Sequence, residues 1–349
     1  MTVHDTTRPD RVAADGGTAW PSVPEFGAPA FPPLHAVVAR PVVRDRWERL
    51  VTEIAIPAPA GAVWEALTDP AAVVDWLAAC RGPWAAAGED SMLDFEDGEF
   101  FWCHTATAEP PGTDTPGTLR YFWRWVGIGP AACVTWTVQP TDGATTVTVT
   151  EEAVNPPSDW RSWNGMGWPG ILEQLAGYLR TRTSWRWPWR RMGPYVQAEL
   201  AAPAFEAWEA LTSSGAVKFW LQRAAGSLAP GDPMTVVMGD ASGTVLLNVT
   251  RSVEAAQEFP SYLPYVEFEL RRPSWERALG GRLWIEPAGL GGSLLEVFHC
   301  NWEGLQLQDP LEERRILTAF WVSAARRAQS MFLARPPSGP PSGPHGWSS

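Results

Sequence analysis

The sequence predicts an α+β protein built from two consecutive copies of one domain, each an antiparallel sheet with helices at its start and end. Three observations support this prediction. The pentapeptide at 64–68, Trp-Glu-Ala-Leu-Thr, recurs at 208–212, 144 residues later. Both halves show the same order of predicted elements, and helices grouped around a run of strands are typical of α+β domains. The length of 349 residues also fits two domains.

The internal repeat extends beyond the pentapeptide. At the same offset, Pro59 matches Pro203, and Val73, Trp76 and Leu77 match Val217, Trp220 and Leu221. An identical pentapeptide with matching flanks is not expected by chance. The two halves are therefore copies whose interiors have diverged.

The first copy begins with alternating apolar residues at 51–57, which predict a strand. Pro59 suits the first turn of a short helix, and a second short helix is predicted at about 70–78. Strands are then predicted at about 91–96, 99–108, 118–126, 132–139 and 145–154. A long helix closes the copy, because Trp168, Leu172, Leu175 and Leu179 recur at helical spacing.

The second copy repeats this order. Its predicted elements are a strand at 195–201, short helices near 204–211 and 215–221, strands near 233–239, 243–253, 264–272, 282–286 and 293–300, and a final helix from about 311 to 333.

The predicted domains occupy residues 45–182 and 195–333. Residues 1–44 are rich in Pro, Ala and Gly and predict a disordered arm, and 334–349 predict a disordered tail. The linker at 183–194 mixes Trp with Arg. Such a stretch can bind single-stranded nucleic acid, but cation–π packing between the domains is favoured here. A linker this short predicts fixed contact between the copies and one shared or communicating pocket.

Charge and composition exclude several classes of function. The chain has 27 Lys and Arg against 39 Asp and Glu, a net charge of −12. Affinity for nucleic acid comes from Lys and Arg, so no nucleic-acid partner is expected. No apolar run predicts a membrane span, and the first residues do not predict a secretory signal. A cytoplasmic protein is therefore expected, and two domains that already pack together are expected to leave a monomer.

Metal and cofactor sites are not predicted either. The four cysteines, Cys80, Cys103, Cys133 and Cys300, lack metal-binding spacing and are interpreted as reduced core thiols. The sequence shows no phosphate-binding glycine loop and no cluster of His, Asp and Glu at metal-ligand spacing. The acidic run at 94–99, around Gly98, predicts a solvated hairpin.

Tryptophan is strongly over-represented, with 22 Trp against 13 Phe and 5 Tyr. Indole rings build cores, but they also line pockets and interfaces. Each Trp taken singly is more often a core residue. Together they exceed what two small cores need, which favours an aromatic cavity for a flat or conjugated ligand.

Strand parity selects the residues that face this cavity. Arg120 and Arg124 alternate with Tyr121, Trp123 and Trp125, so we expect the arginines to face solvent and the aromatic rings to face inward. Both faces of the strand around Trp102 are apolar, so alternation does not decide its side, but Trp102 is included among the candidates. Trp284 is excluded, because it shares a strand face with Arg282 and Glu286. The candidate ligand-binding residues are Trp76, Trp102, Tyr121, Trp123, Trp136, Trp168, Leu172, Trp220, Phe268, Trp302 and Trp321.

Two ionisable residues are the catalytic candidates. Glu151 shares a strand face with Val147 and Val149, and His299 shares one with Leu295 and Val297. The two occupy matching places in the copies, each on the ligand side. Burial there is expected to raise the pKa of a carboxyl, and a histidine can exchange protons near neutral pH. The alternative is that both lie at strand ends, wet or hydrogen-bonded to a neighbour.

The stretch at 63–77, VWEALTDPAAVVDWL, resembles the START-related superfamily of helix-grip proteins, and most of all its heat-shock ATPase-activator subgroup. The matching residues are Ile54, Ile56, Pro59, Val63, Trp64, Leu67, Thr68, Asp69, Pro70 and Trp76. The second copy keeps Trp208, Leu211, Thr212 and Trp220, but has Ser213 and Ser214 where the family has Asp-Pro. The resemblance covers both predicted domains and is more specific for fold than for function.

The resemblance implies a curved sheet wrapped around a long C-terminal helix, with a cavity for hydrophobic ligands between them. Tandem copies in a chain of this composition look like actinobacterial proteins of antibiotic biosynthesis. Some relatives there cyclise polyketides, and some give self-resistance by binding or reacting with an enediyne. Three functions remain open: a protein that binds a hydrophobic, polyketide- or polyene-like molecule, a cofactor-free cyclase or dehydratase that uses Glu151 or His299, and a chaperone-regulator-type interaction protein.

Overall fold

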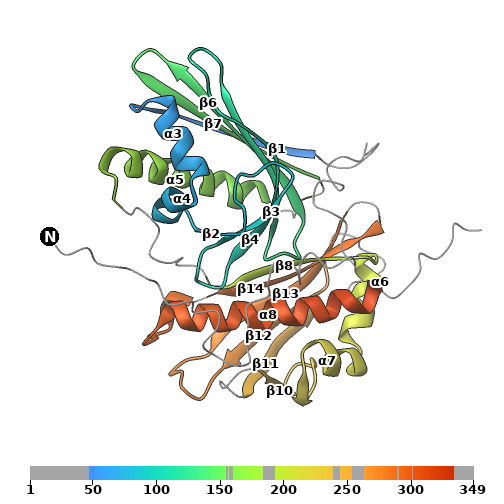
Figure 1. The fold of residues 1–349 in the computed structure, drawn as a ribbon. Coiled ribbons are helices and arrows are strands. Elements are labelled where there is room, and N and C mark those ends of the chain that lie inside the picture. The colour runs from blue at the N-terminus through green and yellow to red at the C-terminus, as the bar shows by residue number, and fades with distance from the viewer. Residues whose placement is uncertain are drawn as a thin grey trace, which may run out of the picture.

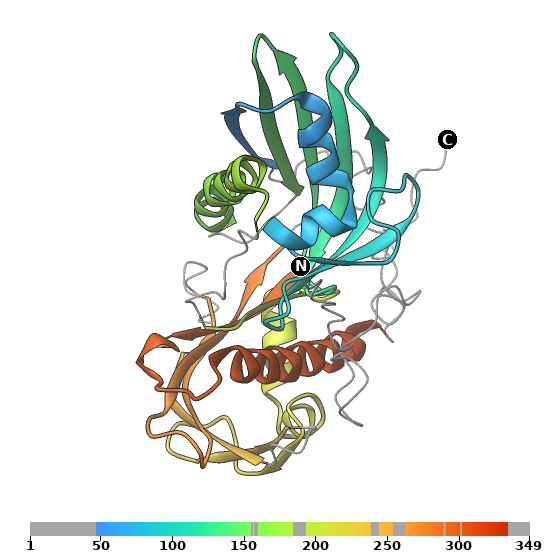
Figure 2. The same cartoon turned by 60° about the vertical axis from the view of Figure 1, so that its left-hand side comes forward.

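The computed structural model describes residues 47–154, 156, 160–183, 193–238, 244–253, 263–288, 291–300 and 302–333. It contains two antiparallel sheets of seven strands, one in each half of the chain (Figures 1 and 2). The predicted α+β fold with two tandem helix-grip domains is confirmed. The predicted arm at 1–44, the tail at 334–349 and linker residues 184–192 lie outside the described residues.

The first sheet has the order β1-β7-β6-β5-β4-β3-β2. Its domain consists of β1 (Trp47–Ile56), α3 (Ala60–Thr68), α4 (Pro70–Trp76), β2 (Ala79–Arg81), β3 (Asp90–Asp94), β4 (Phe100–Glu109), β5 (Gly117–Trp125), β6 (Ala131–Thr141), β7 (Ala144–Val154) and α5 (Trp160–Thr181). Local sequence fixes the helix starts. Pro70 opens α4, and the Asp69 side chain accepts a hydrogen bond from the Ala71 N–H at 3.0 Å.

The second sheet has the equivalent order, β8-β14-β13-β12-β11-β10-β9. Its domain consists of β8 (Tyr195–Leu200), α6 (Ala204–Thr212), α7 (Ser214–Trp220), β9 (Arg223–Ala225), β10 (Met234–Val237), β11 (Thr244–Val253), β12 (Tyr265–Arg271), β13 (Leu279–Pro287), β14 (Ser293–Cys300), η2 (Trp302–Gly304) and α8 (Pro310–Leu333). Ser213 caps α7 by accepting from the Ala216 N–H at 3.4 Å. Ser213 therefore caps α7 as Asp69 caps α4, although the second repeat has Ser-Ser where the family has Asp-Pro.

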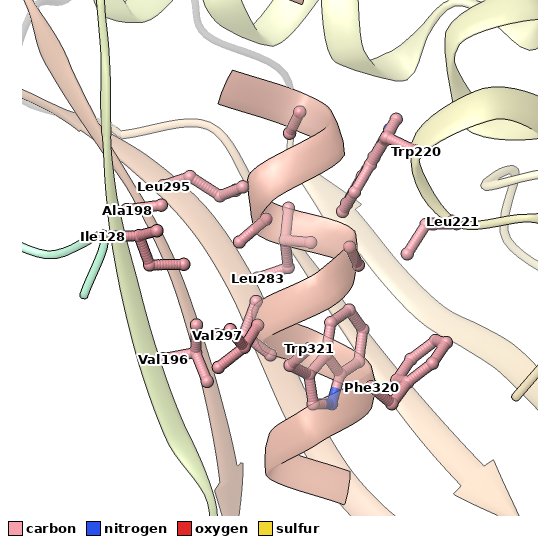
Figure 3. Packing of buried hydrophobic residues seen from close by; sticks show 14 of the residues in the cluster. Ile128, Val196, Ala198, Trp220, Leu221, Leu283, Leu295, Val297, Phe320 and Trp321 are labelled. Carbon is pink, nitrogen blue, oxygen red and sulfur yellow. The ribbon is translucent and has the colours of Figure 1, made fainter. Parts of the chain in front are cut away.

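The two hydrophobic cores are arranged differently. The inner face of the first sheet packs with α3, α4 and α5 into a core of its own. The core of the second domain continues into the outer face of the first sheet, where it includes Met92, Phe100, Trp102, Phe122 and Ile128. Figure 3 shows Ile128, from the first domain, beside Ala198 of β8. One continuous apolar core thus joins the two domains.

Polar contacts reinforce this junction along the free edge of β8. The Glu199 N–H donates to the Ile128 carbonyl oxygen at 2.9 Å, and the Trp125 indole N–H donates to the Tyr195 carbonyl oxygen at 2.9 Å. The Gln329 amide of α8 donates to the carbonyl oxygens of Glu199 and Ile128 at 2.8 and 3.3 Å. The turn between β5 and β6 therefore covers an edge that would otherwise expose unpaired backbone groups.

Buried charges cross the same junction and correct two sequence predictions. Arg314 of α8 is 0% exposed and forms ion pairs with Asp97 and Glu99 of the first domain. The acidic run around Gly98 is therefore not a solvated hairpin. Arg124, expected to face solvent, is 1% exposed, with its guanidinium 3.3 Å from the Glu199 carboxylate.

The expected pocket shared between the copies is also contradicted. The outer face of the first sheet, not its inner face, packs on the second domain, so the first sheet stands between the two inner cores (Figure 1). The thiol prediction holds in part, since Cys103 and Cys133 are buried but Cys300 is exposed. No helix among the described residues is long and apolar enough to cross a membrane.

Candidate functional site

The inner side of the first domain is organised around Glu151. This residue lies on β7 between Leu50 of β1 and Val134 of β6, and it is 1% exposed. Its Oε1 accepts the Trp123 indole N–H at 3.0 Å. Its Oε2 accepts the Trp168 indole N–H at 2.8 Å and the Asn164 amide at 2.7 Å. A buried carboxyl is thus held by three neutral donors from β5 and α5.

Burial dominates the electrostatics of this carboxyl. Loss of hydration raises the pKa of Glu151, and the hydrogen bonds from Asn164, Trp168 and Trp123 oppose that rise without cancelling it. The rise agrees with the expectation from the sequence. A carboxyl held in this way can accept a hydrogen bond when charged and donate one when protonated.

Aromatic rings surround Glu151 as a connected network. Trp123 stacks on Phe101 at 3.8 Å between ring centroids and lies 5.5 Å from Trp168 at an interplanar angle of 22°. Trp136 contacts Trp168 edge-on at 5.6 Å and donates its indole N–H to the Tyr121 hydroxyl at 3.1 Å. The structure therefore brings four predicted residues, Tyr121, Trp123, Trp136 and Trp168, to one side of the sheet, and Leu172 is buried in the same core.

The other two predicted residues of this domain are Trp76 and Trp102. Trp76 is buried and donates its indole N–H to the Ala66 carbonyl oxygen at 2.8 Å, so it fastens α4 to α3 while contacting Trp136 edge-on. Trp102 lies on the opposite face of the sheet, opposite Arg124, and packs in the core shared with the second domain. The expectation that Trp102 faces inward is wrong, and Phe101 faces inward instead.

His299 occupies the place in the second domain that Glu151 occupies in the first, as the sequence predicted. Glu151 pairs with Val134 on the neighbouring strand, and His299 pairs with the corresponding Gly281. His299 Nε2 accepts the Trp321 indole N–H at 2.6 Å, which is the counterpart of the bond from Trp168 to Glu151. The predicted match in position is confirmed, and both groups are buried and hydrogen-bonded to neighbours.

The protonation state of His299 follows from its partners. An indole N–H can only donate, so Nε2 is an acceptor, and Nδ1 carries the proton that it donates to the Gly280 carbonyl oxygen at 3.3 Å. Burial lowers the pKa of His299 to about 4; the positive charge of Arg314 adds to this, and the bond to Gly280 opposes it. His299 is therefore a neutral imidazole near pH 7.

The remaining predicted residues pack the second core. Phe268 faces inward, with its ring centroid 5.6 Å from those of both His299 and Trp321. Gly281 makes room for it, because a Cβ there would lie 2.5 Å from the Phe268 ring. Trp220 donates to the Leu211 carbonyl oxygen at 3.0 Å, repeating the role of Trp76, and Trp302 is buried in the same core.

Sequence reasoning missed Asn164 and Trp84. Asn164 lies one helical turn before Trp168, on the same face of α5, and this spacing was the available signal. Trp84 follows no periodic pattern. Its indole N–H donates to the Leu67 carbonyl oxygen at 2.9 Å, and its ring contacts Tyr121 edge-on at 5.2 Å. No group of His, Cys, Asp and Glu able to hold a metal occurs within the described ranges.

Comparisons with known proteins agree with this geometry. Residues 57–180 match the family model described as activator of Hsp90 ATPase homolog 1-like protein. The crystal structure of DynU16, a protein in the dynemicin biosynthetic locus, has a TM-score of 0.68 and 26% identity, covering 82% of this chain and 99% of that chain. A search of curated proteins finds no match.

Two further solved structures match a smaller part of the chain. Protein MLL2253 from Mesorhizobium loti has 28% identity and a TM-score of 0.34, covering 39% of this chain and 98% of that chain. CalU16 from Micromonospora echinospora has 19% identity and a TM-score of 0.33, covering 39% of this chain and 83% of that chain.

Proposed function

We propose that this chain, whose two tandem domains have the helix-grip fold, binds a hydrophobic, conjugated small molecule between a sheet and its closing helix. The observation that carries the proposal is the aromatic network around Glu151. Ring faces and edges of this kind suit flat or conjugated molecules such as polyketides and polyenes.

The biological setting is part of the same proposal. DynU16 is described as a protein of the dynemicin biosynthetic locus, and the similarity covers 82% of the present chain and 99% of DynU16. This similarity supports a role in the biosynthesis of a secondary metabolite or in self-resistance to it.

A binding experiment tests the proposal. The full chain is titrated with an anthraquinone and with a conjugated polyene, and tryptophan fluorescence and native mass spectrometry report the complex. We expect quenching and a bound mass, and Trp136→Phe should weaken the binding. The matched control is Trp284→Phe, on the outer face beside Tyr195, which should leave binding unchanged. Failure of wild-type protein to bind any member of the panel would contradict the proposed function.

One observation favours a second candidate, a cofactor-free cyclase or dehydratase. The raised pKa of Glu151 gives a carboxyl that can exchange a proton with a bound polyketide chain. We propose this role for Glu151 and not for His299, whose two ring nitrogens are engaged by Trp321 and Gly280. Turnover lost in Glu151→Gln with binding retained would support the enzyme, and unchanged turnover would exclude Glu151 from it.

A further inference from the structure

We propose that the ligand site belongs to the first domain alone, that the second domain is a closed scaffold, and that Glu151 anchors a hydroxyl or phenol group of the ligand. This inference rests on the proposed function and deepens it. It comes from comparing the two domains position by position, using the pairs Glu151–Trp168 and His299–Trp321 as the common reference.

The polar partners of Glu151 have apolar counterparts in the second domain. Four residues before the reference tryptophan stand Asn164 in α5 and Leu317 in α8. Trp123 lies opposite Ala132, and the corresponding pair in the second sheet is Leu270 opposite Leu279. Leu317 and Leu270 are both 0% exposed. Two of the three hydrogen-bond donors have thus become core leucines, so among the described residues the first domain holds a carboxyl bound by three donors and the second holds a neutral imidazole bound by one indole.

The two closing helices also differ in side-chain size, because α5 has small residues where α8 has larger buried ones. The positions of Gly165, Gly167 and Pro169 in α5 correspond to Thr318, Phe320 and Val322 in α8, all three of which are buried. A Cβ on Gly167 would meet nothing within 4 Å, and one on Gly165 would meet only the Leu50 side chain at 3.9 Å. The glycines of α5 are therefore not required by close packing.

Glycine and proline also weaken this half of α5. Glycine is a poorer helix former than alanine, because its backbone loses more conformational freedom on folding. A proline inside a helix removes one backbone hydrogen bond and clashes with the preceding turn. The first turns of α5, which carry Asn164 and Trp168 over Glu151, are therefore held less firmly than the corresponding turns of α8.

The two closing helices also differ in how much of their outer face is buried. The outer face of α5 is exposed at Arg161, Gly165 and Pro169. The corresponding residues of α8, Arg314, Thr318 and Val322, are 0, 0 and 1% exposed. α8 lies between its own sheet and the first domain, while α5 lies clear of the second domain (Figures 1 and 2). A helix packed on both sides cannot move away from its sheet, whereas α5 can do so to admit a ligand.

The chemistry around Glu151 specifies the polar group of the ligand. A carboxylate offers about four acceptor positions, and three hydrogen bonds are formed here, only one of them to Oε1. The neighbouring indole N–H groups are already donated to this carboxylate. A ligand group that adds to this cluster is therefore a donor, and a hydroxyl or phenol on a flat apolar molecule fits best.

The experiment compares two probes and two helix variants in the full chain. The probes are 2-hydroxyanthraquinone and 2-methoxyanthraquinone, which differ only in the donor. Asn164→Leu/Gly167→Phe gives α5 the side chains of α8, and Phe320→Leu in α8 is the matched control. Affinity is measured by tryptophan quenching, stoichiometry by native mass spectrometry, and location by hydrogen exchange of peptides that cover α5 and α8.

We expect one equivalent of the hydroxy probe, with exchange slowed in α5 and unchanged in α8. The α5 variant should bind about tenfold more weakly, because it loses a donor that orients Glu151 and gains a ring in the space that Gly167 leaves open. Phe320→Leu should bind like wild type, and the methoxy probe should bind about tenfold more weakly than the hydroxy probe. Melting curves confirm that each variant is folded.

Different outcomes separate the two claims. Binding of two equivalents, protection of α8, or loss of binding in Phe320→Leu alone would overturn the inference while leaving the proposed function intact. Equal affinity for the two probes would overturn the role of Glu151 as anchor. Absence of binding by wild-type protein to both probes and to the wider panel would remove the proposed function and this inference together.

Discussion

Replacement of Gly98 by alanine should loosen the junction between the domains. Gly98 has φ +99°, and a Cβ there would lie 2.8 Å from the Thr318 Cβ and 2.9 Å from the Arg315 Cα on α8. The left-handed backbone conformation costs a residue with a side chain about 1 kcal/mol. The steric conflict adds about 1–3 kcal/mol, because the backbone of α8 cannot rotate away as a flexible side chain would. The expected loss in free energy of unfolding is therefore about 2–4 kcal/mol.

The matched control is Gly143→Ala. Gly143 has φ +76° in the turn between β6 and β7, but a Cβ there meets nothing within 4 Å. This variant carries the backbone cost alone, about 1 kcal/mol. Urea unfolding followed by tryptophan fluorescence gives both values, and hydrogen exchange of 310–333 reports whether α8 becomes accessible. Equal destabilisation by the two substitutions, or unchanged exchange of α8 in Gly98→Ala, would refute the reasoning.

Three further predictions concern buried ionisable groups. Arg314→Ala should destabilise the chain by about 3–5 kcal/mol in urea unfolding, because the Glu99 carboxylate is left buried without the Arg314 charge. Adding Glu99→Gln to this variant should restore part of the lost stability. If the free-energy changes of the two single variants simply added up in the double variant, the pairing would be contradicted. For Glu151, whose pKa is raised, the folded state binds the proton more tightly, so this residue lowers stability as the pH rises above about 4.5. Glu151→Gln should therefore gain stability relative to wild type as the pH rises above about 4.5 in urea unfolding, and a difference that stays constant with pH would be inconsistent with the raised pKa. Burial lowers the pKa of His299 to about 4, so its contribution to the free energy of unfolding is complete above about pH 6.5 and is lost as the pH falls towards 4. His299→Gln should therefore make the free energy of unfolding depend less on pH in this range. An unchanged dependence on pH would assign the effect to other groups.

The fold was predictable because it depends on patterns that survive divergence. The recurring pentapeptide located both pairs of short helices, and alternation along β5 placed Tyr121 and Trp123 on the inner face. Alternation along β7 and β14 likewise predicted the equivalent positions of Glu151 and His299. Side-chain periodicity within a strand is a local property, so one sequence is enough to read it.

The junction was not predictable from the same patterns. Arg124 and Glu99 are charged, and charge on one face of a strand normally indicates solvent; both are buried because the other domain covers that face. Trp102 was ambiguous for the same reason, since a sheet covered on both sides is apolar on both sides. Asn164 was overlooked because its role depends on a carboxylate contributed by a distant strand.

The position of α8 also limits how the chain can be divided. Cutting between the repeats would expose Met92, Phe100 and Phe122 to water on one fragment and leave Arg314 without its acidic partners on the other. Neither fragment would keep a complete surface, and each would aggregate through its uncovered apolar face. The shared core and the Arg314 ion pairs thus make the two repeats one structural unit.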